Sequence, residues 1–517
     1  MDLIPPLQLG AQNLLDSLCP ESNYLPYWHM SVDQGRTAEY QFRPYCTGHN
    51  IGRWWNTLLR LEKSMGYELP AAIEAAMLEN TWRLADNPAG ILLEDQDPAN
   101  AHTWYIHSYR ETMLALGLLV QYRDSQQAAD QGLQAIERMA HASANLHRWR
   151  FDPGAGSPAV EPQGRGADPV YTHGRAIEGL LCYYRATGAP QALDEARRLA
   201  DFHHRHTVTA DGSLAPGCGH HTHSYLNTVR GLIELAVIQN QQHRLDELLA
   251  TYRKALVPMI TPSGFIAHDI GARHGGDIAS AGDIAHIALL LWDHCRQPDL
   301  LDHAERLVRA RLIPAQVTAP PPLTPRQNQN RDCYRDLPQR FVGTIGGSVG
   351  HAKGQTCVTD FTAAALHSLV ELHDRAIDIE EDCVRVNFHF DKKLNDIQVS
   401  THRRDNQGHL TIDNHIGKSL QVRVPLWADP EAVRIQLNGN VAPLNLINGF
   451  AQLPATEGPS RIQLSYSLTE TRTPELWRDE WADREEITFI WRGDEIAAVD
   501  PLGPYMPPYA KECPSIS

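Results

Sequence analysis

The sequence predicts a mainly α protein, an (α/α)6 toroid of paired helices followed by a C-terminal antiparallel β-sandwich. Between about residues 48 and 375, helical segments that are apolar on nearly every side alternate with amphipathic ones. After Asp378 the apolar residues recur with a period of two, which is typical of strands. At 517 residues the chain also exceeds the ~250–300 residues of a single core, so we expect two domains, 1–378 and 379–517.

The helical part divides into hairpins of one inner and one outer helix. Glu111 to Val120 is apolar nearly all round, which indicates an inner helix, whereas QALDEARRLADF carries a single apolar stripe, which indicates an outer one. The last inner helix is expected near 357–374. An N-terminal segment near Leu7 to Leu18 is expected to be its partner and to close a ring of six hairpins. The other predicted hairpins are 49–64/70–86, 107–123/127–142, 172–187/191–206, 223–239/245–257 and 281–294/299–312.

The C-terminal part contains short segments with alternating apolar residues, separated by turn signals. VRVNFHF, LQVRVPLW, RIQLSYSL and EITFIWRG are of this kind, and Asn438–Gly439 and Asn448–Gly449 indicate tight turns. Seven or more such strands favour a sandwich that packs on the toroid. Two stretches rich in Gly and Pro, Asn145 to Tyr171 and Pro314 to Gly350, are predicted to be loops that wall a cleft.

Composition excludes several classes of partner. A formal net charge of −16 without a Lys/Arg cluster is unfavourable for binding nucleic acid. No segment approaches the ~20 apolar residues of a membrane span, so no membrane partner is expected. The start lacks the pattern of a secretory signal, and the nine cysteines are scattered, so we expect a cytoplasmic protein with reduced thiols. Its oligomeric state is not indicated.

Polar residues open the predicted inner helices, where a buried helix does not require them. Inner helices of a toroid run parallel, so their N-termini gather at one end, which we call the mouth. A polar pocket at the mouth would suit a hydroxyl-rich ligand. Alternatively, the arginines among these residues pair with carboxylates of neighbouring helices inside the toroid. The predicted substrate-binding residues are His49, Arg53, His107, Arg110, His173, Arg175, His223 and Tyr225.

Carboxylates near the mouth are the predicted catalytic residues, because sugar hydrolysis normally requires two of them. Glu111 lies in the first turn of an inner helix, and Asp269, Asp277 and Asp283 lie in the segment GFIAHDIGARHGGDIASAGD. Asp360, at the start of the last inner helix, is a further candidate. Alternatively, these carboxylates have structural roles. Asp283 would then be an N-cap, Asp269 and Asp277 solvated turn residues, and Asp360 a first-turn charge that complements the helix dipole.

Motifs for metals and cofactors are weak or missing, so we predict neither. The densest group of metal-ligating side chains, between Cys218 and His223, matches no standard zinc spacing. The sequence contains no GxGxxG, GxxxxGK[ST] or GxSxG motif.

Three segments carry a resemblance to a known family. GRAIEGLLCYYRATGAPQALDEARRLADF, Gln355-Thr356-Cys357 and LQVRVPLWADPEAVRIQLNGN, with WRGDEIAAVDPLGP near the end, resemble remotely the β-L-arabinofuranosidase-like glycoside hydrolases. The resemblance implies an α/α toroid with a trailing β-sandwich and a carbohydrate substrate. That family holds a zinc-bound cysteine nucleophile with a Glu and a later Cys-Cys pair. Here Gln355 replaces the Glu and no Cys-Cys pair follows, so the resemblance does not extend to the zinc or the nucleophile.

Taken together, the sequence predicts a glycoside hydrolase that acts on a small oligosaccharide by Asp/Glu acid–base chemistry at the mouth. One alternative is a lyase for uronic-acid sugars, with His223, Tyr225, Asn227 and Arg230 as base, acid and charge-neutralising groups. Another is a non-catalytic sugar-binding protein that stacks tryptophans on sugar faces. The sugar, its linkage and the stereochemical outcome stay open.

Overall fold

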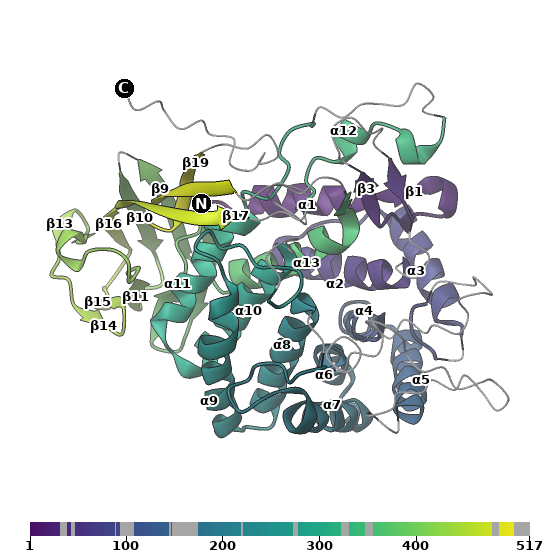
Figure 1. The fold of residues 1–517 in the computed structure, drawn as a ribbon. Helices are drawn as coiled ribbons and strands as arrows, with labels where there is room; N and C mark the ends of the chain where they lie inside the picture. Colours follow the sequence, from purple (N-terminus) through teal and green to yellow (C-terminus); the bar gives the residue numbers. More distant parts are fainter. Residues whose placement is uncertain are drawn as a thin grey trace.

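A computed structural model confirms the predicted fold class: the α-helices end at Asp374, and the strands of the C-terminal sheets begin at Ile377 (Figure 1). Strand ladders and a sandwich core follow the helical ring in the chain. The structure describes residues 1–31, 39–42, 47–87, 89–93, 108–143, 146, 174–218, 221–271, 278–321, 330–346, 355–404, 406–477 and 485–500.

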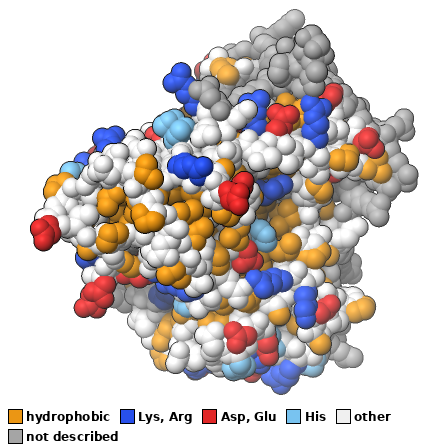
Figure 2. Space-filling model, turned by 90° about the vertical axis from the view of Figure 1, so that its left-hand side faces the viewer, with side chains coloured by type: hydrophobic (Ala, Val, Ile, Leu, Met, Phe, Trp, Pro, Cys, Tyr) orange, Lys and Arg blue, Asp and Glu red, His pale blue; other side chains and the backbone are white. Residues whose placement is uncertain are grey.

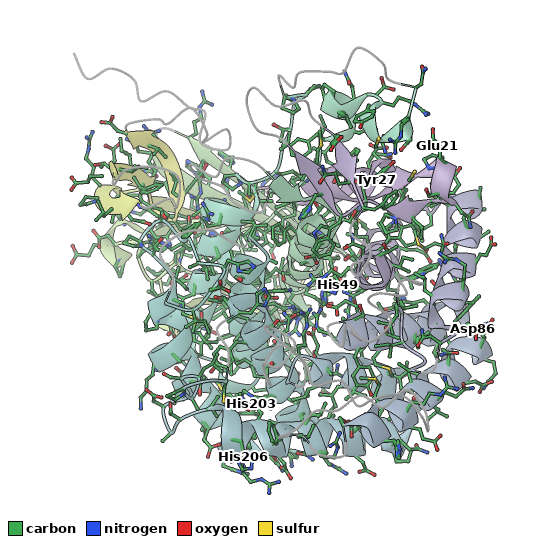
Figure 3. All side chains as sticks on the ribbon, turned by 45° about the vertical axis from the view of Figure 1, so that its right-hand side comes forward. Glu21, Tyr27, His49, Asp86, His203 and His206 are labelled. Atoms are coloured by element: carbon green, nitrogen blue, oxygen red, sulfur yellow. The ribbon has the colours of Figure 1, made fainter. Side chains whose placement is uncertain are left out.

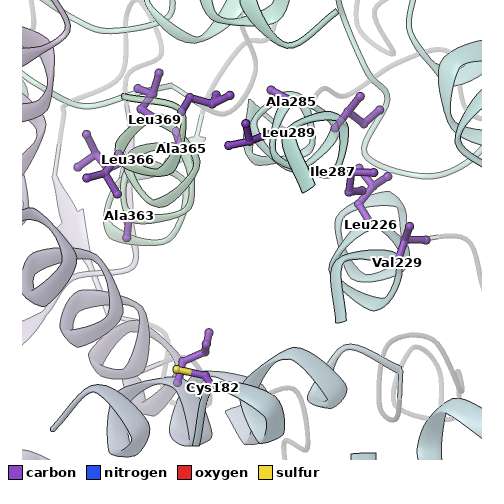
Figure 4. Close-up of a cluster of buried hydrophobic side chains, with 14 of the residues drawn as sticks. Cys182, Leu226, Val229, Ala285, Ile287, Leu289, Ala363, Ala365, Leu366 and Leu369 are labelled. Carbon is purple, nitrogen blue, oxygen red and sulfur yellow. The ribbon is translucent and has the colours of Figure 1, made fainter. Parts of the chain in front are cut away.

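The inner helices form a closed ring around the toroid axis. Each packs against the next one along the chain, and the last packs against the first. Apolar side chains from three of them, including Leu226, Leu289 and Leu366, are buried between the helices (Figure 4). The inner helices are α2 (Thr47–Met65), α4 (Ser108–Arg123), α6 (Ala176–Thr187), α8 (Thr222–Ile238), α10 (Ile278–Cys295) and α13 (Val358–Asp374).

The outer helices cover this ring with one apolar face each. In α7, Ala196 and Leu199 are buried while Asp194 and Arg197 are exposed, as the apolar stripe predicts. The N-terminal helix supplies the last partner, since it packs against α13. The outer helices are α1 (Ile4–Asp16), α3 (Ala71–Ala85), α5 (Gln126–Ala142), α7 (Pro190–Phe202), α9 (Gln242–Thr251) and α11 (Pro298–Leu307). Shorter elements are α12 (Leu337–Arg340), β1 (Leu18–Cys19), β2 (Leu25–Pro26), β3 (His29–Ser31), β4 (Tyr40–Gln41) and β5 (Gln355–Cys357).

Glycines allow the inner helices to approach closely. A methyl group at Gly231 of α8 would lie 2.7 Å from the backbone nitrogen of Glu178 on α6. We expect Gly231→Ala to lower the free energy of unfolding by about 1–3 kcal/mol, because the two helices must move apart. Denaturant unfolding measures this loss, with Gly458→Ala as control, since a methyl group at Gly458 meets nothing within 4 Å. Equal stability of the two variants would contradict the close approach.

The sandwich consists of two sheets with the orders β13-β12-β16-β10-β9-β8 and β14-β15-β11-β7-β6. Among their described pairs all are antiparallel except β7 with β11, which is parallel. Figure 2 views the molecule from the left-hand side of Figure 1, where the sandwich lies, and shows apolar side chains on the surface of that face. The strands are β6 (Ile377–Ile379), β7 (Cys383–Val386), β8 (Lys392–Leu394), β9 (Ile397–Arg404), β10 (Gln407–Asn414), β11 (Ser419–Arg423), β12 (Arg434–Leu437), β13 (Asn440–Val441), β14 (Leu446–Ile447), β15 (Phe450–Leu453) and β16 (Ser460–Ser467).

A third sheet follows the sandwich and packs on the toroid. It contains β17 (Glu470–Trp477), β18 (Glu485–Arg492) and β19 (Glu495–Asp500) in this order. Phe489 and Trp491 belong to the same buried apolar cluster as the helices, and the guanidinium of Arg306 lies 3.8 Å from the Trp491 ring centroid. The chain therefore returns to the toroid after the sandwich, and the division into domains 1–378 and 379–517 stays a prediction.

Candidate functional site

Charged side chains from the inner helices meet on the toroid axis, near the position of His49 in Figure 3. Arg110 of α4 donates to Glu111 at 2.7 Å and to Glu178 of α6 at 2.8 Å. Glu178 in turn lies 2.6 Å from Arg230 of α8, which donates to Asp283 of α10 at 3.0 Å. Acidic and basic groups thus alternate from one inner helix to the next.

His223 and Arg53 close this chain into a ring. The Nδ1 atom of His223 lies 2.5 Å from Asp283 Oδ2, and its Nε2 lies 2.5 Å from Nη2 of Arg53 on α2. Arg53 Nη2 also lies 3.7 Å from Glu111 Oε1. We call the group the axial ring, and its members are Arg53, Arg110, Glu111, Glu178, His223, Arg230 and Asp283.

Three further residues attach to the axial ring. Arg175 donates to Glu111 at 2.6 Å, and Nδ1 of His49 lies 3.4 Å from the same carboxylate. Asp360, from α13, lies 2.9 Å from His49 Nε2 and 2.5 Å from Arg53 Nε. With Asp360 all six inner helices contribute a charged or imidazole group to the cluster.

Burial leaves one accessible side of the cluster. The side chain of Asp360 is 11% exposed and those of Arg53 and His223 are 4% exposed, whereas Glu111 and Arg175 are fully buried. Asp360 is therefore the residue of the cluster that a ligand reaches most readily.

The surroundings shift the pKa values of the carboxyl groups in opposite directions. Burial alone would raise the pKa of Asp360, but Arg53 and His49 outweigh burial and hold this pKa well below its usual range. Glu111 follows the same pattern, since Arg175, His49 and Arg110 lower its pKa against the effect of burial. Both groups are therefore carboxylates at neutral pH.

Asp283 and His223 form a pair that holds a proton between them. Burial raises the pKa of Asp283, although Arg230 opposes the shift, and burial together with Arg53 lowers the pKa of His223 well below its usual value. Because Arg53 donates to Nε2, we assign the imidazole proton to Nδ1, which donates to Asp283. Asn227 donates to the other carboxyl oxygen at 3.1 Å and fixes its orientation.

Several predicted site residues come together in this cluster. His49, Arg53, Arg110, Arg175, His223, Glu111 and Asp283 belong to it. Their arginines lie in ion pairs between helices, which is the alternative that the sequence left open. His107, His173 and Asp277 lie outside the described residues.

Two predicted residues lie elsewhere. The Tyr225 hydroxyl donates to the backbone oxygen of Gly212, and its ring stacks on His203 with centroids 6.2 Å apart. Asp269 is 26% exposed and lies 3.0 Å from Nδ1 of His268. A backbone bridge joins Asp269 to His221, just before α8, so Asp269 belongs to the rim of the mouth.

Glu178 is a member of the axial ring that sequence reasoning missed. It is the only charged residue in the run AIEGLLCYY, and a carboxylate in the first turn of an otherwise apolar helix was the available signal. His367 was missed as well; it is buried, and its Nδ1 accepts a hydrogen bond from Nδ2 of Asn56 at 3.1 Å.

No group of three or more His, Cys, Asp or Glu side chains among the described residues is arranged to hold a metal ion. The absence of a metal or cofactor stays a prediction. Within the same residues, no helix has the length and apolar character needed to cross a membrane.

The substitution Glu111→Gln tests how much the cluster depends on its most buried carboxylate. The change removes one anionic partner each from the buried Arg175 and Arg110, and we expect a loss of about 3–5 kcal/mol in the free energy of unfolding. Denaturant unfolding measures it, with the surface ion-pair variant Glu247→Gln as control, for which less than about 1 kcal/mol is expected. Similar losses in both variants would show that the cluster does not stabilise the fold.

Comparison with known proteins finds the same fold in several solved structures. No family model and no curated protein matches the chain. Among solved structures, the GH127 β-arabinofuranosidase BT3674 is similar with a TM-score of 0.59 and 11% identity, over 96% of this chain and 81% of that one.

Two other structures show the same likeness. The GH127 β-L-arabinofuranosidase Ara127N-Se from Geobacillus stearothermophilus T6 has a TM-score of 0.56 at 12% identity, over 86% of this chain and 76% of that one. A sugar epimerase from a ruminal bacterium has a TM-score of 0.51 at 10% identity, over 72% of this chain and all (100%) of that one. The structure thus confirms the remote resemblance to β-L-arabinofuranosidases at the level of the fold.

Proposed function

We propose that this protein is a glycoside hydrolase that acts on a small oligosaccharide at the accessible side of the axial ring. The observation that carries the proposal is the contrast between Asp360, whose pKa is lowered, and Asp283, whose pKa is raised. Carboxyl groups whose surroundings push their pKa values apart are suited to opposite roles in acid–base catalysis.

In this proposal Asp360 is the anionic nucleophile or base. The His223–Asp283 pair is the acid, and it titrates as one unit. At rest Nε2 carries no proton, because Arg53 donates to it; once a substrate displaces Arg53 from Nε2, the pair takes up one further proton from solvent, and Nε2 delivers this proton to the leaving oxygen. The neutral imidazole that remains can then take a proton from water.

In this proposal the scissile bond lies beside Arg53. Arg53 lies 2.5 Å from both Asp360 and His223, so these groups are separated by one guanidinium and its two contacts. Such a gap is of the order of the ~5–10 Å that glycosidases keep between their catalytic groups. A substrate must displace Nη2 of Arg53 from Nε2 of His223, and Nη2 then donates to a sugar hydroxyl.

The test is hydrolysis of a broad panel of aryl glycosides and oligosaccharides by the full chain. We expect release of reducing sugar from at least one member and a loss of about 100-fold or more in kcat for Asp360→Asn. Asp194→Asn, on the exposed face of α7, is the matched control and should keep full activity. Sugar binding without turnover, or full activity of Asp360→Asn, would overturn the proposal.

The second candidate is the lyase, which the geometry of His223 and Asp283 favours. A neutral imidazole with its Nδ1–H on a carboxylate is a suitable base for removing a proton next to a uronic-acid carboxyl group. However, Tyr225 and Arg230 are occupied by Gly212 and by the carboxylates of the ring. Ultraviolet absorbance from a new double bond in the same panel would select the lyase over the hydrolase.

A further inference from the structure

The two oxygens of the Asp360 side chain have different surroundings. Oδ1 lies 2.9 Å from Nε2 of His49 and 2.5 Å from Nε of Arg53. Oδ2 has no hydrogen-bond partner among the residues that the structure describes, and it does not belong to their fully buried atoms without a partner either. The 11% exposure of this side chain therefore includes Oδ2.

The contacts at Oδ1 indicate which ring nitrogen of His49 carries a proton. Nε of Arg53 lies near both Oδ1 of Asp360 and Nε2 of His49, and its one hydrogen goes to the carboxylate, because a bond between two charged groups is the stronger one. If Nε2 had no proton, its lone pair would face that of Oδ1 at 2.9 Å. We therefore assign a proton to Nε2, which donates to Oδ1.

His49 itself lies out of reach of a ligand. Its side chain is fully buried in the first turn of α2, and the ring of Trp28 packs edge-on against the imidazole with centroids 5.8 Å apart. On its other side Nδ1 lies 3.4 Å from Oε2 of Glu111. His49 can therefore act on a substrate only through the orientation and charge of Asp360.

We propose that His49 is a positioning residue, whose Nε2–H fixes Asp360 so that Oδ2 is the oxygen that reacts. The last torsion of an aspartate side chain is soft, so a carboxylate without donors exchanges its two oxygens. Two donors on Oδ1 prevent this exchange, and the lone pairs of Oδ2 stay available to the sugar carbon or to the attacking water. The inference rests on the hydrolytic function proposed above and names the oxygen and the residue that orients it.

Two amide variants separate the ring nitrogens of His49. The side-chain nitrogen of glutamine takes the place of Nε2, whereas that of asparagine takes the place of Nδ1. We expect His49→Asn to lower kcat by about 10²-fold, because Asp360 is no longer held, and His49→Gln to recover most of this loss. The control is His203→Asn, which removes a buried histidine that packs on Tyr225 and should keep the wild-type kcat.

Titration of the Asp360 carboxyl group supplies a measurement that does not need hydrolysis. Arg53 and His49 hold the pKa of Asp360 well below its usual range against the effect of burial, so loss of the Nε2–H should raise this pKa. Infrared difference spectra between each chain and its Asp360→Asn counterpart follow the protonation. We expect the protonated carboxyl group to appear at a higher pH in His49→Asn than in the wild type, with His49→Gln between them.

The outcomes separate this inference from the proposed function. A raised pKa of Asp360 and a lowered kcat in His49→Asn, both largely restored in His49→Gln, support the positioning role. An unchanged pKa or kcat in His49→Asn, or a loss of about 10²-fold in His49→Gln as well, would overturn it. If the full chain hydrolyses no glycoside while His49→Asn still raises the pKa of Asp360, the hydrolytic function fails and the positioning of Asp360 by His49 stands.

Discussion

Lowering the pH from 7.5 to 5 is expected to destabilise the protein by several kcal/mol. The cause is a set of buried histidines that the fold keeps neutral. Burial lowers the pKa of His203 to about 3 and that of His389 to about 4. The other members of the set, whose pKa values burial lowers well below the usual range, are His223, His286 and His367.

The sign follows from proton uptake. An unfolded histidine titrates near ~6.5, so below this pH the unfolded chain binds protons that the folded chain does not. Stability is therefore present above pH ~6.5 and is lost as the pH falls, by about 2 kcal/mol for each such histidine at pH 5. Burial raises the pKa of Asp293 and of Asp302 to about 6, which acts in the opposite direction but involves fewer groups.

Thermal unfolding at pH 7.5, 6.5, 5.5 and 5 measures this dependence. His203→Phe should reduce the number of protons taken up on unfolding by about one and so weaken the pH dependence of Tm. The reason is that His203 is buried against Tyr225 and its Nδ1 has no partner in the described part of the chain. His415→Gln, at an exposed position, should leave the slope unchanged. A Tm that does not change with pH would mean that these histidines are protonated in the folded state.

The fold could be predicted from the sequence where periodicity is local. The run LCYYRATG ends α6 at Thr187, and Gly188 follows in the left-handed conformation with φ of 71°, which glycine adopts without strain. The parallel pairing of β7 with β11 and the separate sheet of β17–β19 were not predicted. Both depend on which distant strand lies alongside, and alternation within a strand carries no information about its partner.

The site could be predicted only in part for a similar reason. Helix openings rich in His, Arg and Glu indicated which residues gather at the mouth, but not which groups pair there. Tyr225 illustrates the limit: two residues after His223 it points about 200° around the helix, away from the axis, and it packs on His203 instead. Glu178 was missed because it is the only charged residue in an apolar run, and a single charged residue does not by itself indicate a site.

The substitution Asp283→Asn is expected to lower kcat/KM for any hydrolysed glycoside by about 10²- to 10⁴-fold. Asp283 accepts the Nδ1 proton of His223 and, through its raised pKa, allows the pair to carry the proton that catalysis delivers. An amide cannot be protonated in this range, so the acid is lost. Arg230 keeps Glu178 as its partner, and a folded variant is expected.

The pH profile separates this role from a structural one. The pair must be protonated to act, so the activity of the wild type should fall as the pH rises through the pKa of the pair. Asp360 stays ionised throughout, because its pKa is lowered, and adds no second limb between pH 6 and 9. Asp283→Asn should remove the alkaline limb along with most of the rate. If the variant is slow but keeps the same pH dependence, Asp283 only positions His223, and the acid must be sought elsewhere, first at Asp269 on the rim of the mouth.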